Sequence, residues 1–178
     1  MTPEHLRDLF RYTEWADAEV WRAVLAHDAA RTDAKLRGLL VHLHMVQRGF
    51  LLVWQNGPWE PAMRKASSID NVVDLHNWVQ PYYAEAHRFL ESVDAATMAT
   101  GVTMPWVESY QAQLGRTFST PTLAETIFQV TSHSTYHRGQ VNARLREVGG
   151  EPPLVDYIAW IWFGRPEPAW SEVMGAGQ

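Results

Sequence analysis

TPTLAETIFQVTSHSTYHRGQVNARLREVGG, residues 120–150, is the stretch that decides the fold class. Its apolar positions recur every three or four residues, as they do on one face of an α-helix. This inner stripe consists of Leu123, Ile127, Val130, Ser134, Val141, Leu145 and Val148. We expect Thr120 to cap the helix, Pro121 to occupy its first turn and the glycines at 149–150 to end it. The stretch therefore predicts one long helix that packs by a single face.

The same stretch carries a pair of histidines, His133 and His137. Residues four apart lie one turn apart on the same side of a helix, so both imidazoles can reach one metal ion. The pair borders the inner stripe and faces the interior, where an unsatisfied polar ring costs free energy. A metal ion would satisfy both rings, at about 2.1 Å from nitrogen if the ion is zinc. The alternative is a buried pair that is hydrogen-bonded to the backbone or to carboxylates.

A third ligand is expected from residues 40–47, LVHLHMVQ, which contain His42 and His44. Because these two histidines are two positions apart, they point to nearly opposite sides of a helix, and only one can face the site. Each lies at a flank of the apolar stripe of Leu36, Leu43, Phe50 and Trp54. Periodicity therefore does not choose between them. No chemistry is assigned to the remaining histidines, which are His5, His27, His76 and His87.

Three further segments show the helical spacing of apolar residues, at about 3–27, 33–55 and 71–93. Their expected caps are Thr2, Thr32 and Asp70. Pro81 lies inside the last segment and predicts a kink or a split there. Together with the helix that follows residue 120, these segments predict an all-α, antiparallel four-helix bundle. Bundles of this kind commonly hold metal or ligand sites between facing helices.

The remaining segments predict connections rather than long helices. Residues 95–119 contain glycine, proline and β-branched residues, and they indicate either a long loop or a short hairpin of two antiparallel strands. Residues 154–163 are apolar and predict a short C-terminal helix. We expect residues 1–165 to form a single domain and 166–178, rich in proline, glycine and small residues, to form a loosely held tail.

Composition excludes several classes of function. The chain has 178 residues, a formal net charge of −5 and no basic stripe, so nucleic acid is not an expected partner. It has no cysteine, which excludes disulfides, thiolate metal ligands and a cysteine nucleophile. No stretch approaches the roughly 18 apolar residues of a membrane span, and residues 1–8 lack the apolar core of a signal peptide. We therefore expect a cytoplasmic protein with no membrane partner.

Four short runs resemble one protein family. Residues 133–140, HSTYHRGQ, are similar to the fourth-helix signature NHxxxHRGQ of the DinB-like (YfiT-like) metalloenzymes. Residues 12–17, YTEWAD, resemble the family's first-helix YNxWAN. Residues 42–51, HLHMVQRGFL, resemble its second-helix HxxxxERxxL, and residues 149–158, GGEPPLVDYI, resemble its closing GxxPxxDY. The runs span most of the chain and occur in the family's order.

The resemblance implies a four-helix bundle in which three histidines bind one divalent ion, with zinc or nickel expected and manganese or iron as further options. His133 and His137 match the ligands of the fourth helix. His42 matches the ligand of the second helix, because Gln47 then falls on the motif's acidic position and Phe50 lies next to its large apolar position. His44 would break this register and is kept as the reserve. The resemblance also implies a homodimer.

The sequence departs from the family pattern at three positions. Gln47 replaces a frequent glutamate, Asp17 stands where asparagine is usual, and Ser132 replaces the asparagine before the first histidine of the pair. If that glutamate is a base in relatives, its loss weakens the case for the same chemistry here. Arg138 belongs to the motif and is expected to have a structural role, with Asp156 as its candidate partner.

Relatives implied by the resemblance include thiol-dependent transferases, which use low-molecular-weight thiols such as bacillithiol or mycothiol, and hydrolases. The first hypothesis is therefore a metal-dependent thiol transferase or hydrolase that acts on a small molecule. Its pocket is expected among Trp15, Trp54, Trp106 and Tyr136. The second hypothesis is a stress-related bundle that binds a metal or ligand without turnover. The third is a bundle whose histidines only satisfy one another in the core.

Overall fold

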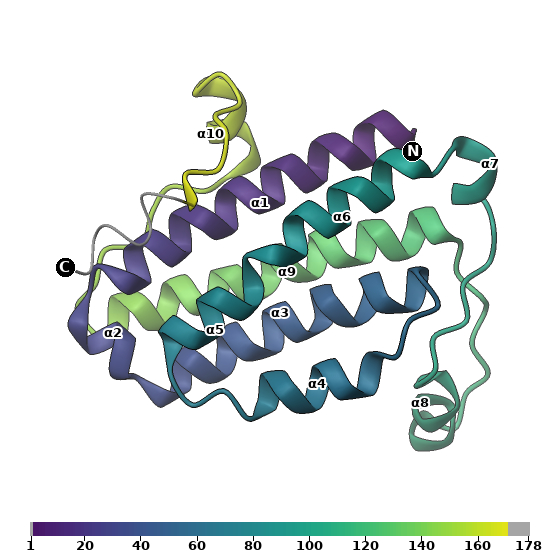
Figure 1. Cartoon of the computed structure of the whole chain (residues 1–178), viewed down its shortest axis with the longest axis horizontal. Coiled ribbons are helices and arrows are strands. Elements are labelled where there is room, and N and C mark those ends of the chain that lie inside the picture. The colour runs from purple at the N-terminus through teal and green to yellow at the C-terminus, as the bar shows by residue number, and fades with distance from the viewer. Residues whose placement is uncertain (1, 171–178) are drawn as a thin grey trace.

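Four long helical segments lie side by side in the structure, a computed structural model that describes residues 2–170 (Figure 1). They are α1 (Pro3–Leu25), α3 (Ala34–Trp54), the consecutive pair α5 (Val72–Val79) and α6 (Pro81–Ser92), and α9 (Leu123–Glu147). The break between α5 and α6 confirms the split predicted at Pro81. Because residues 2–170 contain helices and no strand, the all-α bundle is confirmed as well. No helix in this range has both the length and the apolar character needed to cross a membrane.

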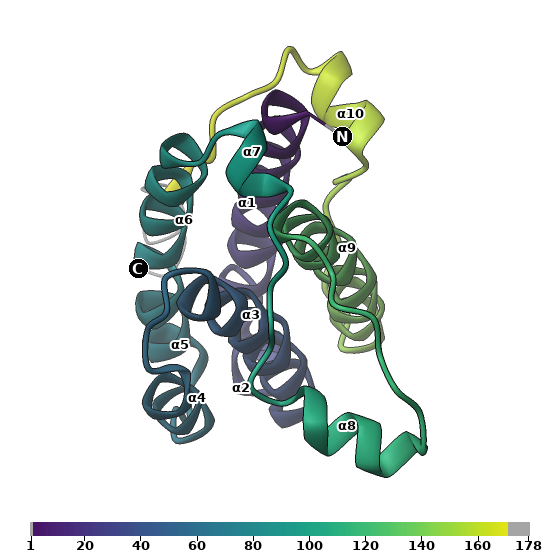
Figure 2. The ribbon, with the colours of Figure 1, turned by 90° about the vertical axis from the view of Figure 1, so that its right-hand side faces the viewer.

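The helix α9 packs against both α3 and α1, and α1 also contacts α6 (Figure 2). Apolar side chains from all four segments form the core between them. Those that are fully buried include Leu6, Trp21, Leu36, Leu40, Leu75, Leu90, Ile127, Val130, Val141 and Leu145. Burial of each such side chain contributes about 1.5–3 kcal/mol relative to exposure. This packing fixes how α3 and α9 are rotated about their axes, and it therefore decides which histidines face each other.

The start of α9 differs from the predicted one. Its cap is Thr122, not Thr120, and Pro121 precedes the helix instead of lying in its first turn. The Thr122 side chain accepts a hydrogen bond from the Glu125 backbone N–H, while the Glu125 carboxylate accepts one from the Thr122 N–H. This reciprocal pair is the capping box, whose T-x-x-E pattern separates the two threonines in the sequence.

Two other predicted caps are also wrong by one residue. Thr32 ends the short helix α2 (Asp28–Thr32), and its hydroxyl donates to backbone carbonyls of that helix. Asp33 therefore caps α3 and accepts a hydrogen bond from the Leu36 N–H at 2.7 Å. Asn71 takes the corresponding place before α5, where Asp70 was expected. The predicted cap Thr2 is confirmed at the start of α1.

The connections are more helical than predicted. Between α3 and α5 the chain forms α4 (Trp59–Ser67), and before α9 it forms α7 (Ala95–Met98) and α8 (Val107–Leu114). The hairpin alternative at 95–119 is therefore wrong, and the expected loop contains the helices α7 and α8. Only an isolated antiparallel bridge, between Gly101 and Thr122, is present in that part of the described chain. The short C-terminal helix is confirmed as α10 (Tyr157–Trp162).

The beginning of the predicted tail packs on the bundle. Trp170 is buried, and its indole N–H donates to Glu14 Oε1 of α1 at 2.9 Å. Pro166 also accepts a hydrogen bond through its carbonyl from the Trp160 indole, at 3.2 Å. The remainder of the predicted tail, residues 171–178, lies outside the described residues. The tail is therefore attached to the bundle at least as far as Trp170.

The ion pair between Asp33 and Arg144 ties the start of α3 to the end of α9. Two guanidinium nitrogens lie 3.0 and 2.6 Å from the two carboxylate oxygens. Arg144 holds the pKa of Asp33 down at about 2, below its ordinary 3.8. We expect Asp33→Asn to lower the free energy of unfolding by about 1–2 kcal/mol at pH 7, because asparagine keeps the cap but loses the charge. Denaturant unfolding of both proteins measures the difference.

The difference in unfolding free energy between the unmodified protein and Asp33→Asn should become smaller as the pH falls. Since the folded-state pKa of Asp33 is lowered, its stabilising effect is present above about pH 4 and is lost as the pH falls toward 2. The two unfolding curves should therefore converge over that interval. Asp28→Asn is the control, because the carboxylate of Asp28 is exposed in its pair with Arg31 and should contribute less than about 0.5 kcal/mol. A constant difference between pH 7 and pH 2 would contradict this assignment.

Candidate metal centre

Three histidines meet between α3 and α9. His42 projects from α3, and His133 and His137 project from consecutive turns of α9. One ring nitrogen of each residue lies within 4.8 Å of those of the other two. The ring centroid of His42 is 5.3 Å from that of His133 and 4.4 Å from that of His137, and the last two are 4.2 Å apart. The structure thus brings together the three residues that were expected to be ligands.

Two of the three rings, those of His133 and His137, have a nitrogen atom that is available to a metal ion. Nδ1 of His137 lies 2.7 Å from Oε1 of Gln140. A carboxamide oxygen only accepts, so Nδ1 carries the proton and Nε2 keeps a lone pair for a metal. Nδ1 of His133 is buried and has no hydrogen-bond partner within residues 2–170. Such an atom is costly unless a ligand meets it. The donor set therefore fits a divalent ion.

For two of the rings, the surroundings favour the neutral form that binds metals. Burial lowers the pKa of His133 to about 4, with smaller contributions from the neighbouring His137 and His42. His42 is exposed on its outer side, but partial desolvation of its ring still lowers its pKa, and the nearby His137 adds to the effect. A metal must displace any proton from the coordinating nitrogen, so a low pKa removes this competition at neutral pH.

The cluster is open on one side. His42 is exposed, whereas His133 and His137 are half-buried. An ion held by these three imidazoles would face the protein on one side and accessible space on the other. Three protein ligands with an open position are typical of catalytic metal sites, whereas structural sites use four.

His44 faces away from the cluster and has another role. It is buried, and its Nε2 accepts a hydrogen bond from the Trp21 indole N–H at 2.9 Å. The proton must then lie on Nδ1, which donates to Oε1 of Gln47 at 2.7 Å. Both nitrogens are therefore engaged in the core. The orientation of α3 places His42, and not His44, beside the pair on α9.

Arg138 forms a buried ion pair with Asp17. Its Nη1 donates to Oδ1 of Asp17 at 2.6 Å, and both side chains are only 2% exposed. The second carboxylate oxygen accepts hydrogen bonds from the Tyr83 hydroxyl at 2.6 Å and from Nε2 of Gln47 at 2.8 Å. The expected pairing of Arg138 with Asp156 is therefore wrong. A guanidinium buried inside the bundle needs a buried countercharge, and Asp17 on α1 provides it.

This ion pair explains two departures from the family pattern. Asp17, in place of asparagine, supplies the negative charge that balances Arg138. Gln47, in place of glutamate, donates from Nε2 to Asp17 and also to the Ser134 hydroxyl at 3.0 Å. A carboxylate at position 47 would instead lie against the carboxylate of Asp17. Because the polar atoms of Gln47 are all engaged in this network, it provides no free base beside the histidines.

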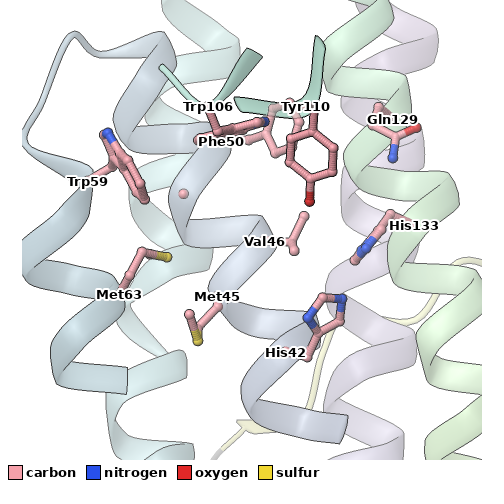
Figure 3. Close-up of a pocket in the computed structure, with 11 residues that line it drawn as sticks. His42, Met45, Val46, Phe50, Trp59, Met63, Trp106, Tyr110, Gln129 and His133 are labelled. Atoms are coloured by element: carbon pink, nitrogen blue, oxygen red, sulfur yellow. The ribbon is translucent and has the colours of Figure 1, made fainter. Parts of the chain in front are cut away.

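A cavity of about 520 Å³ lies next to the histidine cluster. Its walls come from α3, α4, α9 and the segment that contains α8 (Figure 3). The residues that line it are His42, Met45, Val46, Gly49, Phe50, Trp59, Met63, Trp106, Tyr110, Gln129 and His133. Two of the three clustered histidines are thus part of the cavity wall. The volume lies within the range of small-molecule sites, which is about 300–1,000 Å³.

Only one of the four aromatic residues expected in a pocket lines this cavity, namely Trp106. Trp15 and Trp54 are buried in the core, and Tyr136 is 66% exposed beside His137. Sequence reasoning missed the lining residues of α4 and α8, because neither segment was expected to be helical. The tryptophan content of the sequence indicated a pocket, but it did not indicate which tryptophans form it.

The fold and the site together define a class: a helical bundle with a three-histidine cluster between two facing helices and a cavity beside it. The chain belongs to the DinB family, whose family model matches residues 2–168. This match confirms the resemblance that the four sequence runs indicated. No match was found among curated proteins.

Proposed function

We propose that this chain is a metal-dependent enzyme that binds one divalent ion through His42, His133 and His137 and acts on a small molecule. The reaction classes that we propose are thiol transfer, with a low-molecular-weight thiol as one substrate, and hydrolysis. The observation that carries the proposal is the convergence of three imidazole nitrogens beside a cavity. Imidazole ligands suit zinc and nickel, and they also accept iron; manganese prefers oxygen ligands.

The chain's own groups would prepare such a site in two ways. Gln140 fixes the tautomer and the ring orientation of His137 through the hydrogen bond to Nδ1. The apolar cavity walls reduce the access of water to the space beside His42 and His133. When bound, a divalent ion would act as a Lewis acid that favours ionisation of a thiol or of water near neutral pH.

A second candidate function is metal or ligand binding without turnover. It is favoured by one observation, which is that no carboxylate lines the cavity within the described part of the chain. The amide of Gln47 occupies the position where relatives frequently carry glutamate, and it is engaged with Asp17. A general base would then have to come from a histidine or from the substrate itself.

Turnover assays distinguish these two functions. Purified protein loaded with Zn²⁺, Ni²⁺ or Mn²⁺ is incubated with panels of thiols, electrophiles and esters. We expect turnover that disappears with a chelator and in His137→Ala, and that persists in His5→Ala, whose histidine is exposed at the start of α1. Turnover that is equal with and without chelator would contradict a metal-dependent enzyme. Tight metal binding without turnover across the panels would favour the second function.

A further inference from the structure

The cavity beside the histidines has a distinct chemical character. Phe50, Trp59 and Trp106 meet in it, with Trp106 placed edge to face against both other rings at 5.5 Å between centroids. Met45 and Met63 add two flexible thioether side chains, which adapt to the shape of apolar ligands. This part of the wall therefore offers contacts that suit aromatic or alkyl groups.

The polar groups of the cavity are few, and none of them is a side chain with a fixed charge. No aspartate, glutamate, lysine or arginine lines the cavity in the portion of the chain described by the structure. The polar side chains are His42, His133, Gln129 and Tyr110. In Figure 3 the Tyr110 hydroxyl points into the space that His42 and His133 also face. A charged group placed among the apolar walls, away from the histidines, would lose its hydration and meet no side chain of opposite charge, which is unfavourable.

Gly49 is a second feature of the cavity wall, independent of the aromatic residues. It lies inside α3 with ordinary helical geometry, where glycine is less favourable than alanine. A Cβ at this position would meet Met63 Sδ at 3.7 Å and Cε at 3.8 Å, which is ordinary van der Waals contact. Neither backbone conformation nor close packing therefore requires glycine here. The missing side chain instead leaves space in the cavity that Gly49 lines.

We propose that this cavity binds an uncharged aryl or alkyl group of the substrate, while a polar atom of the same molecule faces the histidines. This assignment rests on the proposed function, because it places the substrate beside the metal site. It assigns the substrate class as small molecules whose larger part is apolar and carries no formal charge. The contacts with Phe50, Trp59 and Trp106 would supply affinity, and the polar groups near His133 would set orientation.

A matched pair of fluorescent probes tests the charge preference directly. N-phenyl-1-naphthylamine is uncharged, and 8-anilinonaphthalene-1-sulfonate carries the same ring system with one sulfonate. We expect one molecule of the uncharged probe to bind per chain, at least about tenfold more tightly than the sulfonate, and to change the tryptophan fluorescence. Equal or tighter binding of the sulfonate would overturn the proposal. This comparison uses the unmodified protein and so does not depend on the folding of a variant.

A pair of variants then locates the binding. Gly49→Leu fills the cavity and should weaken binding of the uncharged probe at least about tenfold. Gly38→Leu is the matched control, because Gly38 lies on the same helix, is exposed and would have no neighbouring atom within 4 Å of an added Cβ. This variant should bind the uncharged probe as tightly as the unmodified protein does. Equal probe binding by Gly49→Leu and the unmodified protein would contradict the assignment.

Zinc titration of the same samples separates the two proposals. Gly49→Leu leaves the three histidines in place and should bind one zinc ion as the unmodified protein does. If the unmodified protein binds no zinc, the proposed function fails. If zinc binds but the two probes bind equally well, the cavity assignment fails while the metal proposal stands.

Discussion

Replacing Arg138 by methionine is expected to lower the free energy of unfolding by about 3–5 kcal/mol. The substitution keeps an unbranched side chain of similar length in α9 but removes the cation that faces Asp17. The Asp17 carboxylate then stays 98% buried with hydrogen bonds from Tyr83 and Gln47 but without a countercharge. An uncompensated buried charge is far more costly than the loss of an exposed ion pair. Equilibrium denaturant unfolding at pH 7 measures the change.

Two further variants control this result. Arg146→Met alters an exposed arginine in the last turn of the same helix and should change the unfolding free energy by less than about 0.5 kcal/mol. Asp17→Asn combined with Arg138→Met removes both charges and should recover part of the loss. A loss below about 1 kcal/mol for Arg138→Met alone would contradict the importance of the buried pair.

Substitution of the two neighbouring histidines on α3 should give opposite results. His42→Ala is expected to weaken zinc binding at least about 100-fold. Loss of a residue that only hydrogen-bonds to a metal ligand already lowers metal affinity by about 10–100-fold, and loss of the ligand itself should cost more. It should leave stability nearly unchanged, because His42 is exposed. His44→Ala is expected to lower the free energy of unfolding by about 2–4 kcal/mol, because Trp21 and Gln47 lose their partner inside the core.

Both quantities can be measured on both variants. Isothermal titration with Zn²⁺ gives the affinity, and denaturant unfolding of the metal-free proteins gives the stability. The zinc titration of His44→Ala should be done without denaturant and well below the thermal unfolding midpoint of the variant. The variant is then folded, and we expect it to retain one zinc site. Loss of zinc binding by folded His44→Ala, together with full binding by His42→Ala, would reverse the roles that the structure assigns.

The long helices and the histidine pair could be predicted because their signals are local. The spacing of His133 and His137 places both on one side of any helix, whatever surrounds it. Helical spacing alone could not decide between His42 and His44, because both lie at the edges of the apolar stripe. The family register indicated His42, and the structure shows why His44 is unavailable: the core binds both of its nitrogens.

Other features depend on contacts between residues far apart in the sequence. Asp17 and Arg138 are 121 positions apart, and no periodicity links a carboxylate on α1 to a guanidinium on α9. The short helices α4 and α8 pack by few residues, and α8 has no buried residue at all. Short helices are marginal by themselves and depend on tertiary contacts. The cavity that they help to form could therefore not be predicted from the sequence.

The expected homodimer stays a prediction. Large apolar side chains are exposed on and beside α10, at Leu154, Ile158, Trp162 and Phe163, with exposures of 48–73%. Exposed apolar surface of this kind marks a site where another molecule can bind. Sedimentation equilibrium of the purified chain would establish whether that molecule is a second copy.

The proposed metal site requires that His42, His133 and His137 bind the same ion. Anomalous diffraction from crystals grown with zinc, recorded on both sides of the zinc absorption edge, tests it most directly. We predict a single strong peak about 2.1 Å from one nitrogen of each of the three rings. An anomalous zinc peak only at another place, or no peak between the three rings, would contradict the claim.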